Sequence, residues 1–367
     1  MKMLDYVAMA TSRMSENLAR ADSLVAPAVE AFRASKLRAI RIVASGSSRH
    51  AADCARDAME RALGIPVVVE TPEVYVAHAG HHVLEAFNIA ISQSGYSTNI
   101  LAALDSMKAE GESVVALTGN VGSPIAGHAG LVVDYGVGVE SVDFVTMGVV
   151  TLIEFLVLFA ASAAGELEST LQGLEDAVGA HAAAVELSRK FVEENELVLS
   201  RMAPVVFVGN GPQFGVAEEA SLKFSETLKV PAMHFEGEEF IHGPEMQLTP
   251  DYTVFIIDEP QGSARLASIA SAVSKVTNAT YFVTSRPKGE PFEVVMPGVR
   301  DPFLSGIPSM VLFQYIAAHI TERVGRWDVH PYLADVEEEF AAKAEGYDEA
   351  VKNLELEAAR KYVDNAF

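Results

Sequence analysis

Short apolar runs alternate along the chain with polar loops and longer helical patterns. In the first half the predicted strands are residues 39–44, 66–70, 87–91, 113–118 and 131–135. In the second half they are residues 205–208, 253–257 and 280–284. Continuous apolar strands separated by helices are typical of parallel sheets that are covered on both faces.

Helical spacing of the apolar residues fills most of the remaining chain. The predicted helical segments are residues 1–35, 49–63, 99–110, 148–164, 166–202 and 215–228, with a charged tail at 337–361. The sequence therefore predicts an α/β protein made of two tandem, doubly wound parallel-sheet domains. One large mixed sheet is the alternative.

The expected boundaries follow from the order of these elements. Residues 1–165 form the first domain with its N-terminal helix, residues 166–202 a helical linker, and residues 203–367 the second domain with a C-terminal helical tail. A length of 367 residues suits two domains. With 27 basic against 50 acidic residues, the net charge of −23 argues against a broad nucleic-acid-binding face.

Membrane and redox signals are weak. Cys54 is the single cysteine, which excludes an intramolecular disulfide and a cysteine-based zinc site. The segment Met1–Asp5 lacks the apolar stretch of a signal peptide. The most apolar segment, residues 148–164, is short for a membrane span and carries Glu154, so we expect a buried helix. We expect a cytoplasmic protein whose partners are neither nucleic acid nor membrane.

Two hydroxyl-rich loops follow predicted strands of the first half. They are Ser45–Ser48, with the sequence Ser-Gly-Ser-Ser, and Ser92–Thr98, with the sequence Ser-Gln-Ser-Gly-Tyr-Ser-Thr. Ligands of open α/β sheets lie beyond the carboxyl ends of the strands. Backbone amides, hydroxyls and a helix dipole can hold a monophosphate there. The alternative is that these residues merely cap helices.

Neither loop is a Walker loop or a dinucleotide fingerprint. His81 and His82 are adjacent in a polar turn, so their side chains are poorly placed to face one ion. We therefore expect no metal site and no cofactor.

These loops resemble the phosphosugar-binding loops of the sugar isomerase (SIS) family, and the resemblance covers nearly the whole chain. Glu219–Glu226 resembles the Glu-x-x-x-Lys-x-x-Glu helix of the isomerase half of glucosamine-6-phosphate synthase. Glu239–Pro244 is similar to the Glu-x-x-His-Gly-Pro segment that follows it, and fructosamine-6-phosphate deglycases carry the same Glu and His-Gly-Pro pair. The resemblance implies two tandem SIS domains, which are flavodoxin-like.

The resemblance also implies roles for individual residues and a sugar phosphate as the small-molecule partner. The residues implied to bind the phosphate are Ser92, Gln93, Ser94 and Ser97. Those implied to bind the sugar are Ser47, Ser48 and Lys223. Glu226 is implied as the base that acts on C1 and C2. His242 is implied to assist ring opening or to protonate a leaving group, often from the neighbouring subunit, so a homodimer with a shared active site is expected.

Purely structural roles, without any part in binding or catalysis, remain open for the same residues. Glu219, Lys223 and Glu226 lie at i, i+4 and i+7 and would share one helical face. That pattern also suits a surface ladder of ion pairs, which stabilises a helix by only a few tenths of a kcal/mol per pair. His242 could likewise be a capping or core histidine.

Three departures from the family pattern affect the expected chemistry. Val145-Thr146-Met147 replaces a Ser-Thr-Lys stretch, and Pro331–Asp335 lacks the lysine of a Pro-x-x-Leu-x-Lys segment. No glutaminase domain with a leading cysteine is expected either. Release of an amine, by a deglycase or deaminase, is therefore favoured over its capture, with aldose–ketose isomerisation still open. The alternative is a non-catalytic, phosphosugar-binding regulatory module.

Overall fold

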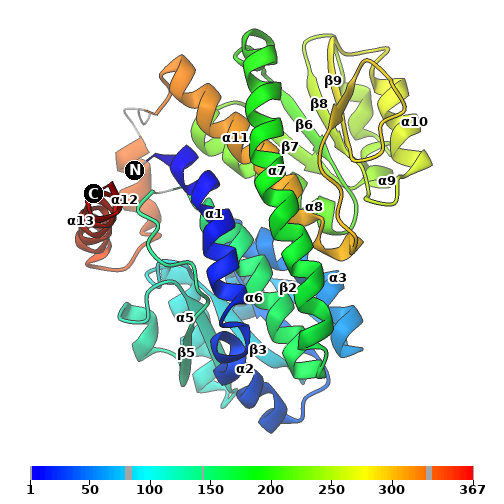
Figure 1. Cartoon of the computed structure of the whole chain (residues 1–367). Helices are drawn as coiled ribbons and strands as arrows, with labels where there is room; N and C mark the ends of the chain where they lie inside the picture. Colours follow the sequence, from blue (N-terminus) through cyan, green and yellow to red (C-terminus); the bar gives the residue numbers. More distant parts are fainter. Residues whose placement is uncertain (1, 79–84, 143, 328–332, 367) are drawn as a thin grey trace. The chain divides into compact units, whose positions relative to one another are not determined.

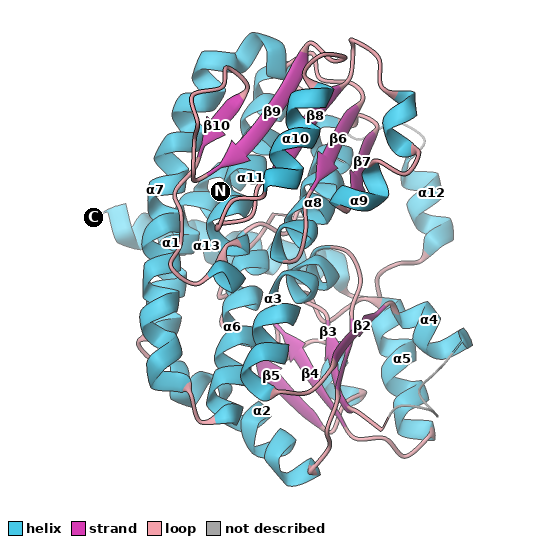
Figure 2. Cartoon of the chain, turned by 90° about the vertical axis from the view of Figure 1, so that its right-hand side faces the viewer, coloured by secondary structure: helices cyan, strands magenta, loops and turns pink. Residues whose placement is uncertain are grey.

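The structure, a computed structural model, contains two separate five-stranded parallel sheets with helices on both faces (Figure 1, Figure 2). It describes residues 2–78, 85–142, 144–327 and 333–366. The predicted α/β class with two parallel sheets is thereby confirmed, and the described strands do not form one mixed sheet.

The chain divides into two compact units. The first comprises residues 1–52, 58–170 and 329–367, and the second comprises residues 53–57 and 171–328. This division differs from the expected boundaries at the C-terminus, because the tail makes its contacts with the first unit. It also places most of the expected linker in the second unit, as the long helix α7 (Leu167–Leu199).

The first sheet has the strand order β2-β1-β3-β4-β5, which is the flavodoxin-like order. Its strands are β1 (Ile40–Val43), β2 (Val67–Glu70), β3 (Phe87–Ile91), β4 (Val114–Thr118) and β5 (Leu131–Asp134). Its helices are α1 (Met3–Leu18), α2 (Ala21–Ser35), α3 (Ser47–Leu63), α4 (Pro72–His78), α5 (Thr98–Ala109) and α6 (Met147–Ala164). The C-terminal helices α12 (Leu333–Phe340) and α13 (Tyr347–Ala366) complete this unit.

Apolar side chains fill both faces of this sheet. On one face, strand residues such as Ala90 and Ala116 pack in one cluster with Leu104 of α5 and Tyr75 of α4. On the other face, Phe87 of β3 stacks on Phe159 of α6, with ring centroids 6.3 Å apart. The sheet is therefore buried on both sides, as its continuous apolar strands predict.

The second sheet repeats this order as β10-β9-β8-β6-β7. Its strands are β6 (Val205–Val208), β7 (Ala232–Phe235), β8 (Thr253–Ile257), β9 (Ala279–Thr284) and β10 (Glu293–Val295). Besides α7, its helices are α8 (Pro212–Lys223), α9 (Gly237–Phe240), α10 (Ala264–Val273) and α11 (Gly306–Val324). Strands β7 and β10 were not anticipated from the sequence.

Two helical segments are long and apolar enough to cross a membrane by length and composition, Met147–Ala164 and Pro302–Val324. In the structure they are 83% and 78% buried. The expectation of a buried helix at residues 148–164 is thus confirmed, since α6 packs against α1 and α2 inside the first unit.

Glu154 is the one acidic residue of α6, and it is fully buried. Its Oε2 accepts a hydrogen bond from Nδ2 of Asn17 at 3.0 Å, and Asn17 also donates to the carbonyl of Gly136. Burial raises the pKa of the Glu154 carboxyl well above its usual value, although Asn17 and the charge of Arg20 act against that shift. Glu154 therefore retains its proton in the folded state over a range of pH in which an exposed glutamate is ionised.

This burial makes stability depend on pH. A carboxyl whose pKa is raised on folding stabilises the protein below its unfolded pKa, and the contribution is lost as the pH rises towards the folded pKa. Glu154→Gln cannot titrate, so over the pH range just above the ordinary pKa of a glutamate its free energy of unfolding should gain on wild type by up to about 1.4 kcal/mol per pH unit. Urea unfolding followed by circular dichroism at several pH values measures this difference. A constant difference across that range would contradict the assignment.

Candidate functional site

The two hydroxyl-rich loops lie at the carboxyl ends of β1 and β3, which are neighbours in the first sheet. In the flavodoxin-like order this is the point where the strand order reverses, and ligands bind in the crevice there. Nδ2 of Asn99, in the first turn of α5, donates to Oγ of Ser45 at 3.0 Å. The structure therefore brings the two loops together, and Asn99 is a link that sequence reasoning missed.

The loop Ser92–Thr98, which we call the phosphate loop, is held by its own hydroxyls. Oγ of Ser92 donates to Oγ of Ser97 at 3.0 Å and accepts from the amide of Gly95 at 3.1 Å. Oγ of Ser94 accepts from the amide of Tyr96 at 3.2 Å. Three of the four predicted phosphate-binding side chains thus belong to one compact turn at the amino end of α5.

The side chain of Gln93 has a different environment. Its Nε2 donates to Oε2 of Glu140 at 2.7 Å, and its Oε1 accepts from the hydroxyl of Tyr135 at 2.7 Å. The Glu140 carboxylate also accepts from the amides of Thr146, Met147 and Gly148 at 2.9, 2.7 and 3.0 Å. The Gln93 side chain therefore anchors the loop to the amino end of α6, and the predicted phosphate-binding role of Gln93 stays a prediction.

Glu140 is the centre of this anchor. Burial raises the pKa of its carboxyl, while the hydrogen bonds from Gln93 and three backbone amides favour the ionised form and oppose that shift. A carboxylate at a helix amino end is also stabilised by the helix dipole. The segment after β5 thus contributes to the site even though Met147 replaces the family lysine.

The predicted sugar-binding serines of the first loop begin α3. Ser47 is buried and Ser48 is partly buried, and Gly46 precedes them with a φ of 55°. Both serines therefore lie at the helix amino end that faces the carboxyl edge of the sheet.

The equivalent loop of the second sheet follows β8. There the carboxylate of Asp258 accepts from the amides of Ser263 and Glu259 at 2.8 and 3.0 Å and from Oγ1 of Thr284 at 2.7 Å. A side-chain carboxylate of the chain itself thus fills the place that an anion would take at the start of α10. In the first sheet the corresponding loop presents hydroxyls.

A buried ion cluster lies at the end of α8. Nζ of Lys223 is 2.6 Å from Oε2 of Glu226 and 3.4 Å from Oε1 of Glu219. The side chains of Lys223 and Glu219 are almost wholly buried, whereas that of Glu226 is 30% exposed. Burial disfavours the Lys223 ammonium, but the two carboxylates outweigh this cost and raise the pKa of Lys223 above its usual value.

The helix changes its winding at this cluster. Helix α8 ends at Lys223, and residues Phe224–Leu228 form a π-helical turn that contains Glu226. Single π-turns within α-helices occur frequently at functional sites. The surface ion-pair ladder considered from the sequence does not describe this cluster, because its lysine and one of its glutamates are buried.

His242 is exposed, in a different segment of the second unit. Its Nδ1 lies 2.6 Å from the backbone carbonyl of Glu238, so Nδ1 carries the proton and Nε2 faces away from that bond. The following Gly243 has a φ of 136°, a region that favours glycine. Exposure of the ring argues against a core histidine, and its role in a neighbouring subunit stays a prediction.

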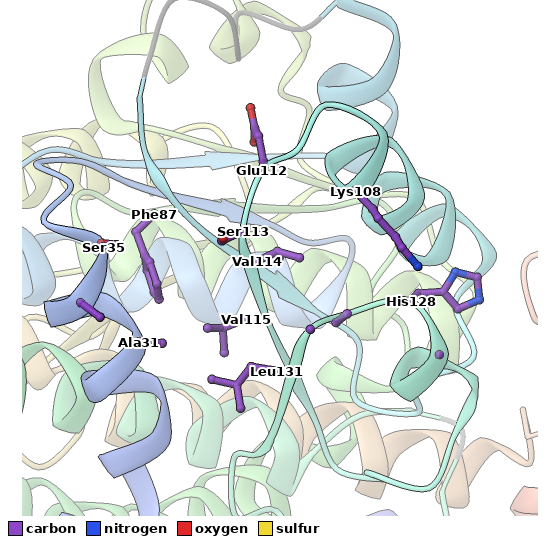
Figure 3. Close-up of a pocket in the computed structure, with 14 residues that line it drawn as sticks. Ala31, Ser35, Phe87, Lys108, Glu112, Ser113, Val114, Val115, His128 and Leu131 are labelled. Atoms are coloured by element: carbon purple, nitrogen blue, oxygen red, sulfur yellow. The ribbon is translucent and has the colours of Figure 1, made fainter.

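A pocket of about 610 Å³ lies at the opposite edge of the first sheet (Figure 3). Phe87, Val114 and Leu131, which begin β3, β4 and β5, line it, and Lys108 and His128 lie at one side. Ligands of parallel sheets bind at the carboxyl edge, so this pocket is not assigned to the substrate. The paired histidines His81 and His82 lie outside the described residues.

Gly95 offers a direct test of the phosphate loop. Its φ is +73°, and an added Cβ would lie 1.7 Å from Oγ of Ser123. We expect Gly95→Ala to distort the loop and to weaken the binding of inorganic phosphate at least tenfold, as measured by isothermal titration calorimetry. Gly111→Ala is the matched control, because its φ of +74° is similar and its Cβ would meet no atom within 4 Å. Equal phosphate affinity in the two variants would contradict the assignment of this loop.

Comparison with known proteins places part of the chain in a family. Residues 35–161 match the model of the SIS domain family. Glutamine–fructose-6-phosphate aminotransferase (isomerizing) of Gloeobacter violaceus is 25% identical over 303 residues, which are 79% of this chain and 50% of that protein. The chain thus spans about half the length of the curated relatives it matches.

Solved structures extend the likeness to both sheets. A protein from Clostridium difficile 630 that is assigned as a phosphosugar isomerase aligns with a TM-score of 0.82 at 22% identity, over 91% of this chain and 98% of that one. Glucosamine-6-phosphate deaminase from Thermotoga maritima aligns with a TM-score of 0.69 at 19% identity, over 87% of this chain and 95% of that one. At these identities the likeness concerns the fold. Residues 35–161 therefore match the SIS domain family, and most of the chain shares the two-sheet fold of these solved structures.

Proposed function

We propose that this protein is an enzyme that acts on an amino-sugar or ketosamine 6-phosphate. The phosphate group is held by Ser92, Ser94, Ser97 and the backbone of Gln93, and the sugar by Ser47, Ser48 and Lys223. Glu226 transfers a proton between C1 and C2, and the amine is then released. Aldose–ketose isomerisation would use the same proton transfer without that release. We expect a cytoplasmic homodimer.

The observation that carries this proposal is the buried cluster of Lys223, Glu219 and Glu226. Burying an ammonium and a carboxylate costs several kcal/mol, and a hydrophobic replacement of similar volume is often as stable. A fold therefore gains little from such a cluster at the end of a helix. Strongly perturbed, charge-coupled groups are concentrated at functional sites.

Within the cluster, Glu226 is the group suited to proton transfer. Its side chain is 30% exposed, whereas that of Glu219 is buried, so Glu226 has access to a bound molecule. The Lys223 ammonium lies 2.6 Å from the carboxyl group of Glu226, which is the group of the pair that can act as a base. The ring of His242, fixed through Nδ1, directs Nε2 away from the Glu238 carbonyl. In the neutral ring Nε2 accepts a proton, and only the imidazolium can donate that proton to a ring oxygen or a departing amine.

Amine release is favoured by two observations. Residues Pro331–Asp335 contain no lysine, so the Schiff-base lysine of the synthase has no counterpart at that position. The fold likeness to a glucosamine-6-phosphate deaminase supports the same direction. The Gloeobacter violaceus relative is an aminotransferase, and this chain matches half of its length.

A second candidate function is a non-catalytic, phosphosugar-binding module. The observation in its favour is the short ion pair between Lys223 and Glu226 at 2.6 Å. A carboxylate that is stabilised in its ionised form is a weaker base. Under this interpretation the cluster only shapes the sugar pocket.

Glu226→Gln separates the two candidates. A positioned general base contributes about 10²–10⁴ in rate, so turnover of the substrate should fall by at least a hundredfold. Mass spectrometry of fructosamine 6-phosphates and glucosamine 6-phosphate, scored for glucose 6-phosphate, fructose 6-phosphate and free amine, identifies that substrate. Binding of glucose 6-phosphate should change by less than about threefold, because Lys223 keeps Glu219 as a partner.

Glu290→Gln is the matched control, since Glu290 is an exposed carboxylate of the same unit. It should retain full activity. Undiminished turnover in Glu226→Gln would overturn the assigned role of Glu226. If wild type consumes none of the compounds yet binds glucose 6-phosphate, the regulatory module is the correct interpretation.

A further inference from the structure

The C-terminal tail pairs directly with the phosphate loop. Ser97 and Lys343 form an antiparallel β-bridge. The amide of Thr98 donates to the carbonyl of Ala342 at 3.1 Å, and the amide of Ala344 donates to the carbonyl of Tyr96 at 2.8 Å. We call residues 341–347 the strap. It is separated from the loop by more than 240 residues of sequence, yet both belong to the first unit.

Side chains reinforce this backbone pairing. The rings of Tyr96 and Tyr347 meet edge to face, with centroids 5.8 Å apart. Ala344 packs against the apolar cluster beneath α5. Oγ1 of Thr98 also donates to the carbonyl of Ala341 at 2.9 Å. The strap is therefore a packed part of the loop's surroundings.

The register of the bridge places Lys343 directly opposite Ser97 of the phosphate loop. Residues directly opposite each other in an antiparallel pair project from the same face, with Cβ atoms about 4.5–5.5 Å apart. The Ser97 hydroxyl on that face lies 3.0 Å from the Ser92 hydroxyl. The Lys343 side chain thus starts beside the hydroxyls of the phosphate loop. Its Nζ now lies 4.9 Å from the centroid of the Tyr347 ring.

Charge gives a reason for a cation at this place. The loop Ser92–Thr98 offers only neutral donors, and the chain carries a net charge of −23. The position that holds a lysine in the resembling family is the buried Met147. An ammonium would offset the repulsion between a phosphate dianion and an acidic protein.

We propose that Lys343, presented by the strap, is a phosphate-binding residue that pairs with the phosphate group held on Ser92–Thr98. This inference rests on the proposed role of that loop. When phosphate binds, the ammonium forms a charge-assisted hydrogen bond to a phosphate oxygen. The strap then supplies the charge that Met147 does not.

The test is the affinity for inorganic phosphate of the full chain, measured by isothermal titration calorimetry. Lys343→Met should weaken binding about tenfold, and Lys343→Arg should stay within about threefold of wild type, because it keeps the charge. Lys352→Met is the matched control, since Lys352 is an exposed lysine of the adjoining helix α13, and its affinity should be unchanged. Lys343 is itself exposed, so its replacement leaves the core intact.

The outcomes separate this inference from the proposed enzyme activity, because no turnover is measured. Equal phosphate affinity in Lys343→Met and wild type would overturn the inference and leave the activity untouched. The inference also fails if wild type binds no phosphate, or if Lys343→Arg loses as much affinity as Lys343→Met. A selective loss in Lys343→Met would support the inference even if none of the sugar phosphates is consumed.

Discussion

The phosphate loop and the central helix of the first unit depend on one buried carboxylate. Glu140 accepts hydrogen bonds from three successive amides at the amino end of α6 and from the side chain of Gln93. Hydrogen bonds to a charged group contribute about 1.5–3 kcal/mol each. Loss of the carboxylate would leave those buried amides without a partner. It would also release Gln93, and with it the turn that carries Ser92, Ser94 and Ser97.

A buried carboxylate also fixes the corresponding loop of the second sheet, but from a different position. Both have the strand order 2-1-3-4-5, and each has a loop and a helix after its central strand. After β8, the Asp258 carboxylate accepts the amides of that loop and so occupies the position of an anion. After β3, the corresponding position carries serine hydroxyls, and the acidic group that fixes the loop lies behind it, at Glu140. The loop after β8 therefore has its amides occupied by a carboxylate of the chain itself. The loop after β3 presents hydroxyl groups instead.

The sequence predicts all five strands of the first sheet, including the edge strands β2 and β5, but it misses both edge strands of the second sheet. Strands such as β6 and β8 are continuous apolar runs that are buried on both faces, so their hydrophobicity alone identifies them. Strand β7, Ala-Met-His-Phe, is only partly buried and has no β-branched residue, and β10 has three residues. Such edge strands form because a neighbouring strand offers free hydrogen-bonding groups, which no local pattern encodes.

Sites built from distant segments were equally hard to predict. The hydroxyl loop and the Glu219–Glu226 helix are local patterns, so the sequence identified both. The clamp of Gln93 between Tyr135 and Glu140 and the pairing of Lys343 with Ser97 depend on tertiary contacts over 40 to 250 residues of chain. The π-turn at Phe224–Leu228 also has no sequence signal, although it brings Glu226 within 2.6 Å of Lys223.

The two units offer different electrostatic environments. In the second unit the carboxyl groups of Glu219 and Glu226 lie 3.4 and 2.6 Å from a single ammonium, that of Lys223. An acidic site suits a base and attracts an ammonium or a carbon that gains positive character, but it repels a phosphate dianion. A phosphate loop of hydroxyls, amides and a helix amino end, with Lys343 opposite Ser97, provides the complementary environment. The proposed substrate, with an anionic phosphate and an amine, carries one charge suited to each of these environments.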